Sequence, residues 1–187
     1  MKKYQITDPS HFPREKSGFS HALSASVRRF RPDFVCLRDR NNPRYEALAR
    51  LFVRLCRRLG TKALLHNSPT AAKRLGAFGV HLSGSMQREI GRAKRSGAFV
   101  IASTHSRGEA VRAFKRGADR IVISPIFEVA NKGLPLGVSF LQSLNPTIRS
   151  KTIALGGIVD EAHARCLSGV FAFASIRFFV RKDNNGV

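Results

Sequence analysis

The sequence has few acidic residues, only three cysteines and no tryptophan. Cys36, Cys56 and Cys166 are odd in number and widely spaced, and no Cys-x-x-Cys pair occurs among them. This pattern excludes a disulfide scaffold and a cysteine-based zinc site, and it favours a reducing compartment. No run approaches the roughly 18 apolar residues of a membrane span, and the first residues lack the apolar stretch of a secretory signal. We therefore expect a cytoplasmic protein with no membrane partner.

The shortage of acidic side chains leaves 33 Lys and Arg against 12 Asp and Glu, a formal net charge of +21. Such a charge suits a polyanionic partner, because cations that neutralise phosphates release counterions. Along residues 44–59, however, apolar residues recur at helical spacing and the arginines fall mostly off that stripe, as on a solvated helix. No basic tract is interleaved with aromatic residues. We therefore do not expect specific nucleic-acid binding, and we keep a catalytically silent protein that binds a phosphorylated ligand or RNA as an alternative.

Short apolar runs alternate with helical stretches along all 187 residues, without a linker. The runs FVIAS, RIVIS and TIALG are apolar throughout, which is typical of parallel strands covered on both faces. Glycines directly after Leu75 and Arg116 mark two helix ends. The pattern predicts an α/β protein with one domain over residues 1–187, a small (β/α)8 (TIM) barrel. The expected strands are 3–7, 33–37, 62–65, 79–82, 99–103, 120–124, 152–155 and 170–174. Helical stretches are expected after them at 21–29, 44–59, 70–75, 87–96, 108–116, 138–144, 160–167 and 176–180. An open flavodoxin-like sheet is the alternative, but it would leave several units unplaced.

A phosphate site is predicted after the last two strands. In a barrel, the residues that follow the strands meet at one rim, where barrel enzymes place their chemistry. Gly156 and Gly157 follow the seventh expected strand, and Ala174 and Ser175 end the eighth. Two glycines let backbone N–H groups approach a phosphate, and a helix after Ser175 would direct its N-terminus to the same place. A tight turn is the alternative explanation of the glycine pair.

One histidine is a candidate for proton transfer. His105 follows the fifth expected strand among Ser and Thr residues, and an imidazole with its ordinary pKa near 6.5 suits proton transfer at neutral pH. A helix-capping or positioning role is the alternative. His81 lies inside a strand with apolar neighbours, so we expect it in the core.

Cationic side chains are expected at the same rim. Arg38 and Arg40 flank Asp39 after the second strand, and a guanidinium binds phosphate or carboxylate with two parallel hydrogen bonds. Lys132 lies in a long loop whose Gly and Pro residues suit a lid. A surface pair of arginines and a solvated loop lysine are the alternatives.

Several familiar sites are absent from the sequence. No two carboxylates stand at neighbouring strand ends, so no magnesium site built from acidic ligands is predicted. Likewise, no His/Cys zinc cluster, P-loop lysine motif or Gly-x-Ser-x-Gly elbow occurs. We therefore expect no cofactor.

The segments AAKRLGAFGVHLS, IASTHSRGEAVRAFKRGADRIVISPIF and ALGGI, in this order, resemble the thiamine-phosphate synthase and thiazole tautomerase (TenI-like) superfamily. The likeness runs from YQITDP to the final strand. It implies a (β/α)8 barrel in thiamine biosynthesis. The polar positions of the family are matched by Arg38, Arg40, Asn67, Ser103 and Lys132.

The synthase branch joins a pyrimidine diphosphate to a thiazole phosphate and releases pyrophosphate, with Mg²⁺ held by two aspartates. The resemblance places Ser68 and Met86 at those two positions, and it places Val129 and Asn131 where two threonines of the pyrophosphate loop stand. Mg²⁺ is expected only if this chain is nevertheless a synthase.

The tautomerase branch moves one proton on a phosphorylated carboxythiazole and needs no metal. The resemblance gives the acid/base role to His105, and it places the phosphate on Gly156, Gly157 and the start of the last helix. The sequence retains these residues and lacks the metal aspartates. The first expectation is therefore an isomerase, a metal-independent thiazole tautomerase acting on a small phosphorylated thiazole, and a divergent synthase is the alternative. The oligomeric state is left open, a homo-oligomer included.

Overall fold

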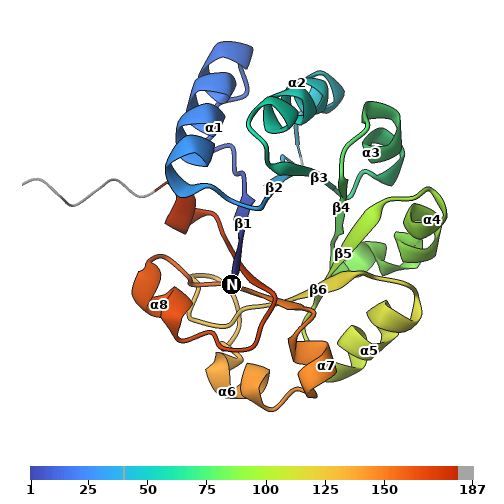
Figure 1. Ribbon diagram of the computed structural model, residues 1–187, viewed down its shortest axis with the longest axis vertical. Coiled ribbons are helices and arrows are strands. Elements are labelled where there is room, and N and C mark those ends of the chain that lie inside the picture. Colours follow the sequence, from blue (N-terminus) through green and yellow to red (C-terminus); the bar gives the residue numbers. More distant parts are fainter. Residues whose placement is uncertain (40, 181–187) are drawn as a thin grey trace, which may run out of the picture.

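A computed structural model describes residues 1–39 and 41–180. Its eight strands are all parallel and form a closed barrel in sequence order, in which β8 pairs with β1. In Figure 1 the barrel is seen with the helices outside the strands. This confirms the predicted (β/α)8 barrel and excludes the open sheet. The strands are β1 (Lys2–Ile6), β2 (Phe34–Leu37), β3 (Lys62–His66), β4 (Gly79–Leu82), β5 (Phe99–Thr104), β6 (Arg120–Ile123), β7 (Thr152–Leu155) and β8 (Ala172–Ser175).

Helices follow the strands, and most of them are short. Only α1 and α2 exceed nine residues, which is how the fold fits a chain of this length. The helices are α1 (Lys16–Phe30), α2 (Tyr45–Arg58), α3 (Pro69–Leu75), α4 (Ile90–Arg95), α5 (Arg107–Lys115), α6 (Gly137–Gln142), α7 (Pro146–Arg149) and α8 (Glu161–Arg165), with 3-10 turns η1 (Gly84–Glu89) and η2 (Arg177–Phe179).

Alternation along the strands builds two layers of core. In β5, Ile101 belongs to the cluster inside the barrel, whereas Val100 and Ala102 pack between the strands and the helices. Successive side chains of a strand point to opposite faces. Because both faces are covered, the strands are apolar throughout, as the sequence predicted.

Several helix boundaries differ from the expected ones. Gly76 and Gly117 have φ values of 63° and 98°, so both predicted glycine ends are confirmed. The helix expected over 160–167 forms only over Glu161–Arg165, and the helix expected over 87–96 divides into η1 and α4. The sequence analysis missed α7, although its start is visible in the sequence: Pro146 lies in its first turn, and the side chain of Asn145 accepts a hydrogen bond from the Thr147 N–H at 2.9 Å.

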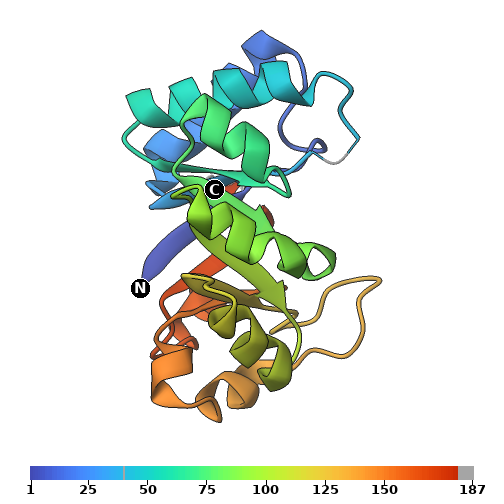
Figure 2. The same ribbon diagram turned by 90° about the vertical axis from the view of Figure 1, so that its right-hand side faces the viewer.

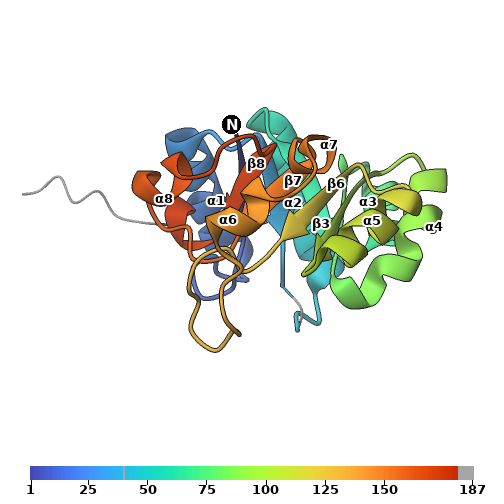
Figure 3. The same cartoon turned by 90° about the horizontal axis from the view of Figure 1, so that it is seen from below.

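The barrel has two chemically different ends. The loops after the strands, including the long loop between β6 and α6 (gold), project to one side in Figures 2 and 3, and the amino terminus lies on the other. The helices run antiparallel to the strands, so their C-terminal ends lie at the end where the strands begin. Among the described residues, no helix is long and apolar enough to span a membrane.

Candidate functional site

A cavity of about 500 Å³ opens at the carboxyl end of the barrel, and residues in or just after all eight strands line it. A cavity of this size is typical of a small-molecule site. It brings together seven of the residues singled out in the sequence. They are Arg38, Ser103, His105, Lys132, Gly156, Gly157 and Ser175.

Two further sequence candidates are not part of this lining, and a third is not among the described residues. Asn67 instead connects the ends of β3 and β4, since its Oδ1 accepts from the Ser83 N–H at 2.7 Å and its Nδ2 donates to Ser83 Oγ at 3.0 Å. The side chain of Ala174 is fully buried inside the barrel. Arg40 lies outside the described residues.

Close packing requires the glycine pair after β7. Gly156 and Gly157 have φ values of 104° and 71°. A Cβ on Gly157 would lie 2.6 Å from Phe127 Cβ and 2.7 Å from the Glu128 carbonyl oxygen, in the loop after β6. The loop after β6 therefore packs directly on the glycine turn. At the turn, bare backbone forms the wall of the cavity.

Ser175 organises the backbone beside the glycine turn. Its hydroxyl donates to the Ile158 carbonyl at 2.6 Å and accepts from the Phe178 N–H at 3.1 Å. This connects the turn after β7 to the start of η2. Arg177 in η2 lines the cavity, and the sequence analysis missed it because nothing near it in the chain distinguishes it from other arginines.

His105 has a defined ring orientation. Its Nδ1 lies 2.8 Å from the Ser124 carbonyl oxygen. A carbonyl oxygen only accepts, so Nδ1 carries the proton and, in the neutral ring, Nε2 is the free base. A helix cap holds the backbone here: the Ser106 side chain accepts from the Glu109 N–H, and the Glu109 carboxylate accepts from the His105 N–H at 2.7 Å.

His81 lies deep in the barrel, as expected, but it also forms part of the cavity floor. Its Nδ1 is 2.9 Å from the Tyr4 hydroxyl and its Nε2 is 2.9 Å from Ser103 Oγ. Burial, with the nearby charges of His66 and Arg38, lowers the pKa of His81 to about 3. The ring is therefore neutral near pH 7 and acts as a fixed hydrogen-bonding partner of Ser103. Val80 and Leu82 pack on the outer face of β4, so the alternating residues Gly79 and His81 point into the barrel. This alternation is the sequence signal that could have placed His81 at the cavity floor.

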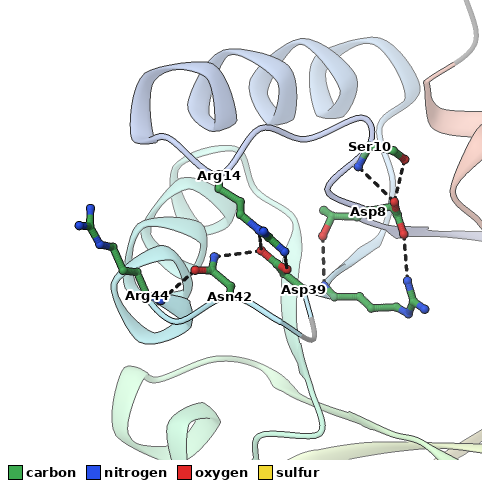
Figure 4. A network of polar contacts seen from close by, with 8 residues as sticks. Asp8, Ser10, Arg14, Asp39, Asn42 and Arg44 are labelled. Atoms are coloured by element: carbon green, nitrogen blue, oxygen red, sulfur yellow. Dashed lines mark hydrogen bonds and ion pairs between the residues drawn. The ribbon is translucent and has the colours of Figure 1, made fainter.

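Arg38 faces the cavity next to a carboxylate that the sequence analysis did not single out. Its guanidinium donates to Asp8 Oδ2 at 2.9 Å, and Asp8 also accepts from the N–H and hydroxyl of Ser10. Burial of Asp8 opposes its ionisation, but the Ser10 hydrogen bonds and the charge of Arg38 outweigh this and hold its pKa below the usual value. Figure 4 shows Asp8 and Ser10 side by side.

Asp39 is turned to a separate network. Arg14 binds it through two hydrogen bonds of 2.9 and 2.7 Å, and Asn42 donates to it at 2.9 Å. In Figure 4 these three residues form a group apart from Asp8. Asp8 and Asp39 thus do follow neighbouring strands, which corrects the sequence analysis. Asp39, however, holds the loops after β1 and β2 together and does not line the cavity.

A family model described as thiamine monophosphate synthase, of the TMP-TENI family, matches residues 4–179. The chain belongs to the thiamine monophosphate synthase family. This confirms the resemblance.

Related sequences and structures agree with this family. The thiamine-phosphate synthase of Lysinibacillus sphaericus is 34% identical over 121 residues, 61% of this chain and 56% of that protein. That of Methanoculleus marisnigri is 31% identical over 134 residues, 67% of this chain and 63% of that protein. The matches thus span less than two thirds of the length of these relatives. A thiamine phosphate pyrophosphorylase structure from Pyrococcus furiosus has a TM-score of 0.81 at 23% identity and covers 97% of this chain and 89% of that one, which supports the fold.

These relatives favour the synthase reaction over the tautomerase that the sequence analysis placed first. None of the relatives named above is described as a tautomerase. The first expectation from the sequence is therefore not supported by the comparisons, and its alternative is.

A magnesium site of two aspartates does not fit the residues present. Ser68 turns its hydroxyl back to the His66 carbonyl at 3.1 Å, and Met86 packs against the outer core. Asp8 is the one carboxylate among the described residues that line the cavity, and it is engaged by Arg38. Residues 1–39 and 41–180 contain no cluster of three His, Cys, Asp or Glu that could hold a metal ion.

Lys132 reaches the cavity from the loop between β6 and α6. Its backbone N–H donates to the Val129 carbonyl at 3.1 Å, and Val129 also lines the cavity. Leu134, near the tip of this loop, is 93% exposed. The loop thus presents one cation to the cavity, and Val129 and Asn131 stand where the resemblance implies two threonines.

Proposed function

We propose that this protein is an enzyme of thiamine biosynthesis whose cavity binds a phosphorylated thiazole. The observation that carries the proposal is the cavity at the carboxyl end of the barrel. There the Gly156–Gly157 turn and the backbone organised by Ser175 line the same cavity as the cations Arg38 and Lys132. Backbone next to glycines and the guanidinium and ammonium groups are suited to phosphate.

The transferase reaction is the first candidate, because the comparisons favour it. A thiazole phosphate would attack a pyrimidine diphosphate, and pyrophosphate would leave. Negative charge then grows on the leaving group, and Arg38, Lys132 and Arg177 are the cavity's cations that can stabilise it. The carboxylate of Asp8 orients Arg38 without neutralising the other two cations.

The test supplies the purified protein with both substrates, with and without Mg²⁺, and measures thiamine phosphate and pyrophosphate. We expect equal amounts of the two products. Lys132→Ala should lower turnover by about 10² to 10³, the cost of removing one charge-stabilising group. Lys115→Ala, an exposed lysine outside the cavity, is the matched control and should leave turnover unchanged. Absence of thiamine phosphate under both conditions would rule out the transferase.

Thiazole tautomerisation is the second candidate, and the geometry of His105 favours it. The hydrogen bond from Nδ1 to the Ser124 carbonyl leaves Nε2 as a base on a ring that lines the cavity. Such a base can take a proton from one ring position of a bound thiazole and return it to another, without a metal.

This candidate is tested with the carboxythiazole phosphate tautomer alone, without the pyrimidine diphosphate. His105→Ala should lower the conversion by about 10² to 10⁴ while the substrate still binds. His163→Ala is the control, since His163 is bonded to Asp160 and does not line the cavity. Conversion that is unchanged in His105→Ala would exclude the assignment.

A further inference from the structure

The positive charge of this protein is concentrated at the end of the barrel opposite the cavity. Every described helix except α6 carries one or more basic residues in its last turn, and all these turns lie where the strands begin. A cation near the C-terminus of a helix stabilises the helix through its dipole, and this accounts for some of these basic residues. The dipole does not account for Lys62 and Lys151, which are exposed at the same end but lie outside the helices and their caps.

Acidic residues do not balance this charge. Among the described residues, Asp33 and Asp119 are the acids placed just before strands at this end. Asp33 accepts from Lys2 at 2.8 Å, and Asp119 accepts from Lys94 at 2.9 and 2.8 Å. Within residues 1–39 and 41–180, Arg57, Arg58 and Arg31 form no ion pair. These side chains are free to bind an external anion.

Aromatic rings lie in the middle of this charged surface. Phe78, just before β4, packs against Phe34 and Phe99 with ring centroids 6.0 and 5.0 Å apart. The side chain of Phe78 is 39% exposed, although it packs on the rings that cover the end of the barrel where the strands begin. The ammonium of Lys62 lies 4.8 Å from the centre of its ring. The structure thus builds the pairing of aromatic and basic groups that no stretch of the sequence contains.

Two hollows with basic walls open between the surrounding helices. One of about 530 Å³ lies at the ends of α1 and α2 and is lined by Arg28, Arg31 and Asp33, whose carboxylate is paired with Lys2. The other, of about 310 Å³, lies between α3 and α4 and is lined by Lys73, Arg92 and Arg95. Their lining residues belong to α1–α4 and the segments beside these helices, and Lys62 begins β3 and Phe78 precedes β4 in the same part of the chain. Figure 1 shows that α1–α4 cover one half of the barrel.

We propose that this surface binds single-stranded nucleic acid without reading its sequence. We call it the basal face and define it by Arg28, Arg31, Arg57, Arg58, Lys62 and Phe78. The arginines would neutralise phosphates, and an unpaired base would stack on Phe78. An exposed ring beside cations favours unpaired bases over a duplex, whose bases are stacked on each other. The proposal does not depend on the proposed enzyme activity, since the basal face and the cavity lie at opposite ends of the barrel.

The test measures the binding of fluorescein-labelled oligouridine to the full chain by fluorescence anisotropy between about 50 and about 200 mM salt. The basal variant is Arg57→Glu with Arg58→Glu. Its control is Arg44→Glu with Arg88→Glu, which changes the net charge equally at exposed positions near the carboxyl end of the barrel. We expect affinity to fall by about tenfold or more in the basal variant, and the slope of log K against log salt to shrink by about 1.4, for two lost phosphate contacts. The control should lose much less.

Phe78→Leu tests stacking, because it removes the ring but keeps an apolar side chain packed on Phe34 and Phe99. We expect it to weaken oligouridine binding by several-fold and to leave binding of a duplex of equal length unchanged, because only an unpaired base can stack on the ring. Equal losses in the basal and control variants would show that only net charge matters and would overturn the proposal. So would tighter binding of anionic lipid vesicles than of oligouridine, or an unaffected Phe78→Leu variant. Thiamine phosphate formation, assayed in parallel, should be the same in all these variants.

Discussion

At the residue scale, depth in the barrel gives three histidines different chemistry. His105 is exposed at the rim with one ring nitrogen free, whereas His81 is buried with both nitrogens hydrogen-bonded. His66, on the neighbouring strand, packs edge-on against His81 with ring centroids 5.8 Å apart. His105 is therefore the one of the three that presents a ring nitrogen at the rim, and His81 fixes the Ser103 hydroxyl.

The buried His81 makes stability depend on pH. Its pKa of about 3 in the folded state lies below the ordinary value of 6.5, so the unfolded chain binds the extra proton between these values. This contribution to stability is therefore fully present above about pH 6.5 and is lost as the pH falls toward 3. The expected loss is about 1.4 kcal/mol per pH unit in that window.

Denaturant unfolding of the wild type and His81→Gln at several pH values checks this. Each protein gives a slope of the free energy of unfolding against pH. The difference between the two slopes isolates the effect of His81 from that of the carboxylates, which also titrate below pH 5. Parallel pH profiles for the two proteins would contradict the prediction.

At the element scale, the turn after β7 and the loop after β6 form one unit. Gly157→Ala would bring a Cβ against Phe127 and Glu128, at a backbone φ of 71° that alanine disfavours. We expect a loss of about 2 kcal/mol or more in the free energy of unfolding. Because this loop carries Lys132, the loss of enzyme activity should exceed the loss of folded protein.

Thermal unfolding together with turnover per folded molecule measures both effects. Gly133→Ala, in the same loop with open space around the position, is the control and should change neither. A Gly157→Ala protein of normal stability would show that the close contacts relax without cost.

The cap of α5 fixes the position of His105. Ser106→Ala removes the acceptor of the Glu109 N–H and should lower the free energy of unfolding by about 1 kcal/mol. Conversion of the carboxythiazole should also fall, because the cap holds the backbone that carries His105. Ser106→Asp restores an acceptor and should recover both stability and conversion. If Ser106→Ala behaves as the wild type in both measurements, the cap does not hold this histidine.

At the scale of the whole molecule, a formal net charge of +21 opposes folding by self-repulsion. Ions screen this repulsion, with a Debye length that falls from about 30 Å at 0.01 M to about 8 Å at 0.15 M. We expect Tm to rise over this range, by about 2–4 °C for each kcal/mol of repulsion removed. Differential scanning calorimetry in sodium chloride measures it. A constant or falling Tm would mean that favourable ion pairs outweigh the repulsion.

The sequence by itself determined the eight-unit barrel, because the strands are apolar throughout, helical periods follow them, and glycines such as Gly76 end the helices. It also placed His105, Arg38 and Lys132 at the rim, since strand order alone brings the carboxyl ends of parallel strands together.

Only the tertiary structure decided the rest, because it depends on contacts between distant segments. The bond from Asn67 to Ser83, the pairing of Asp8 with Arg38 and the place of His81 in the cavity floor come from neighbouring strands. In the same way, Phe78 and Lys62 are 16 residues apart and meet only because β3 and β4 start side by side at the floor of the closed barrel.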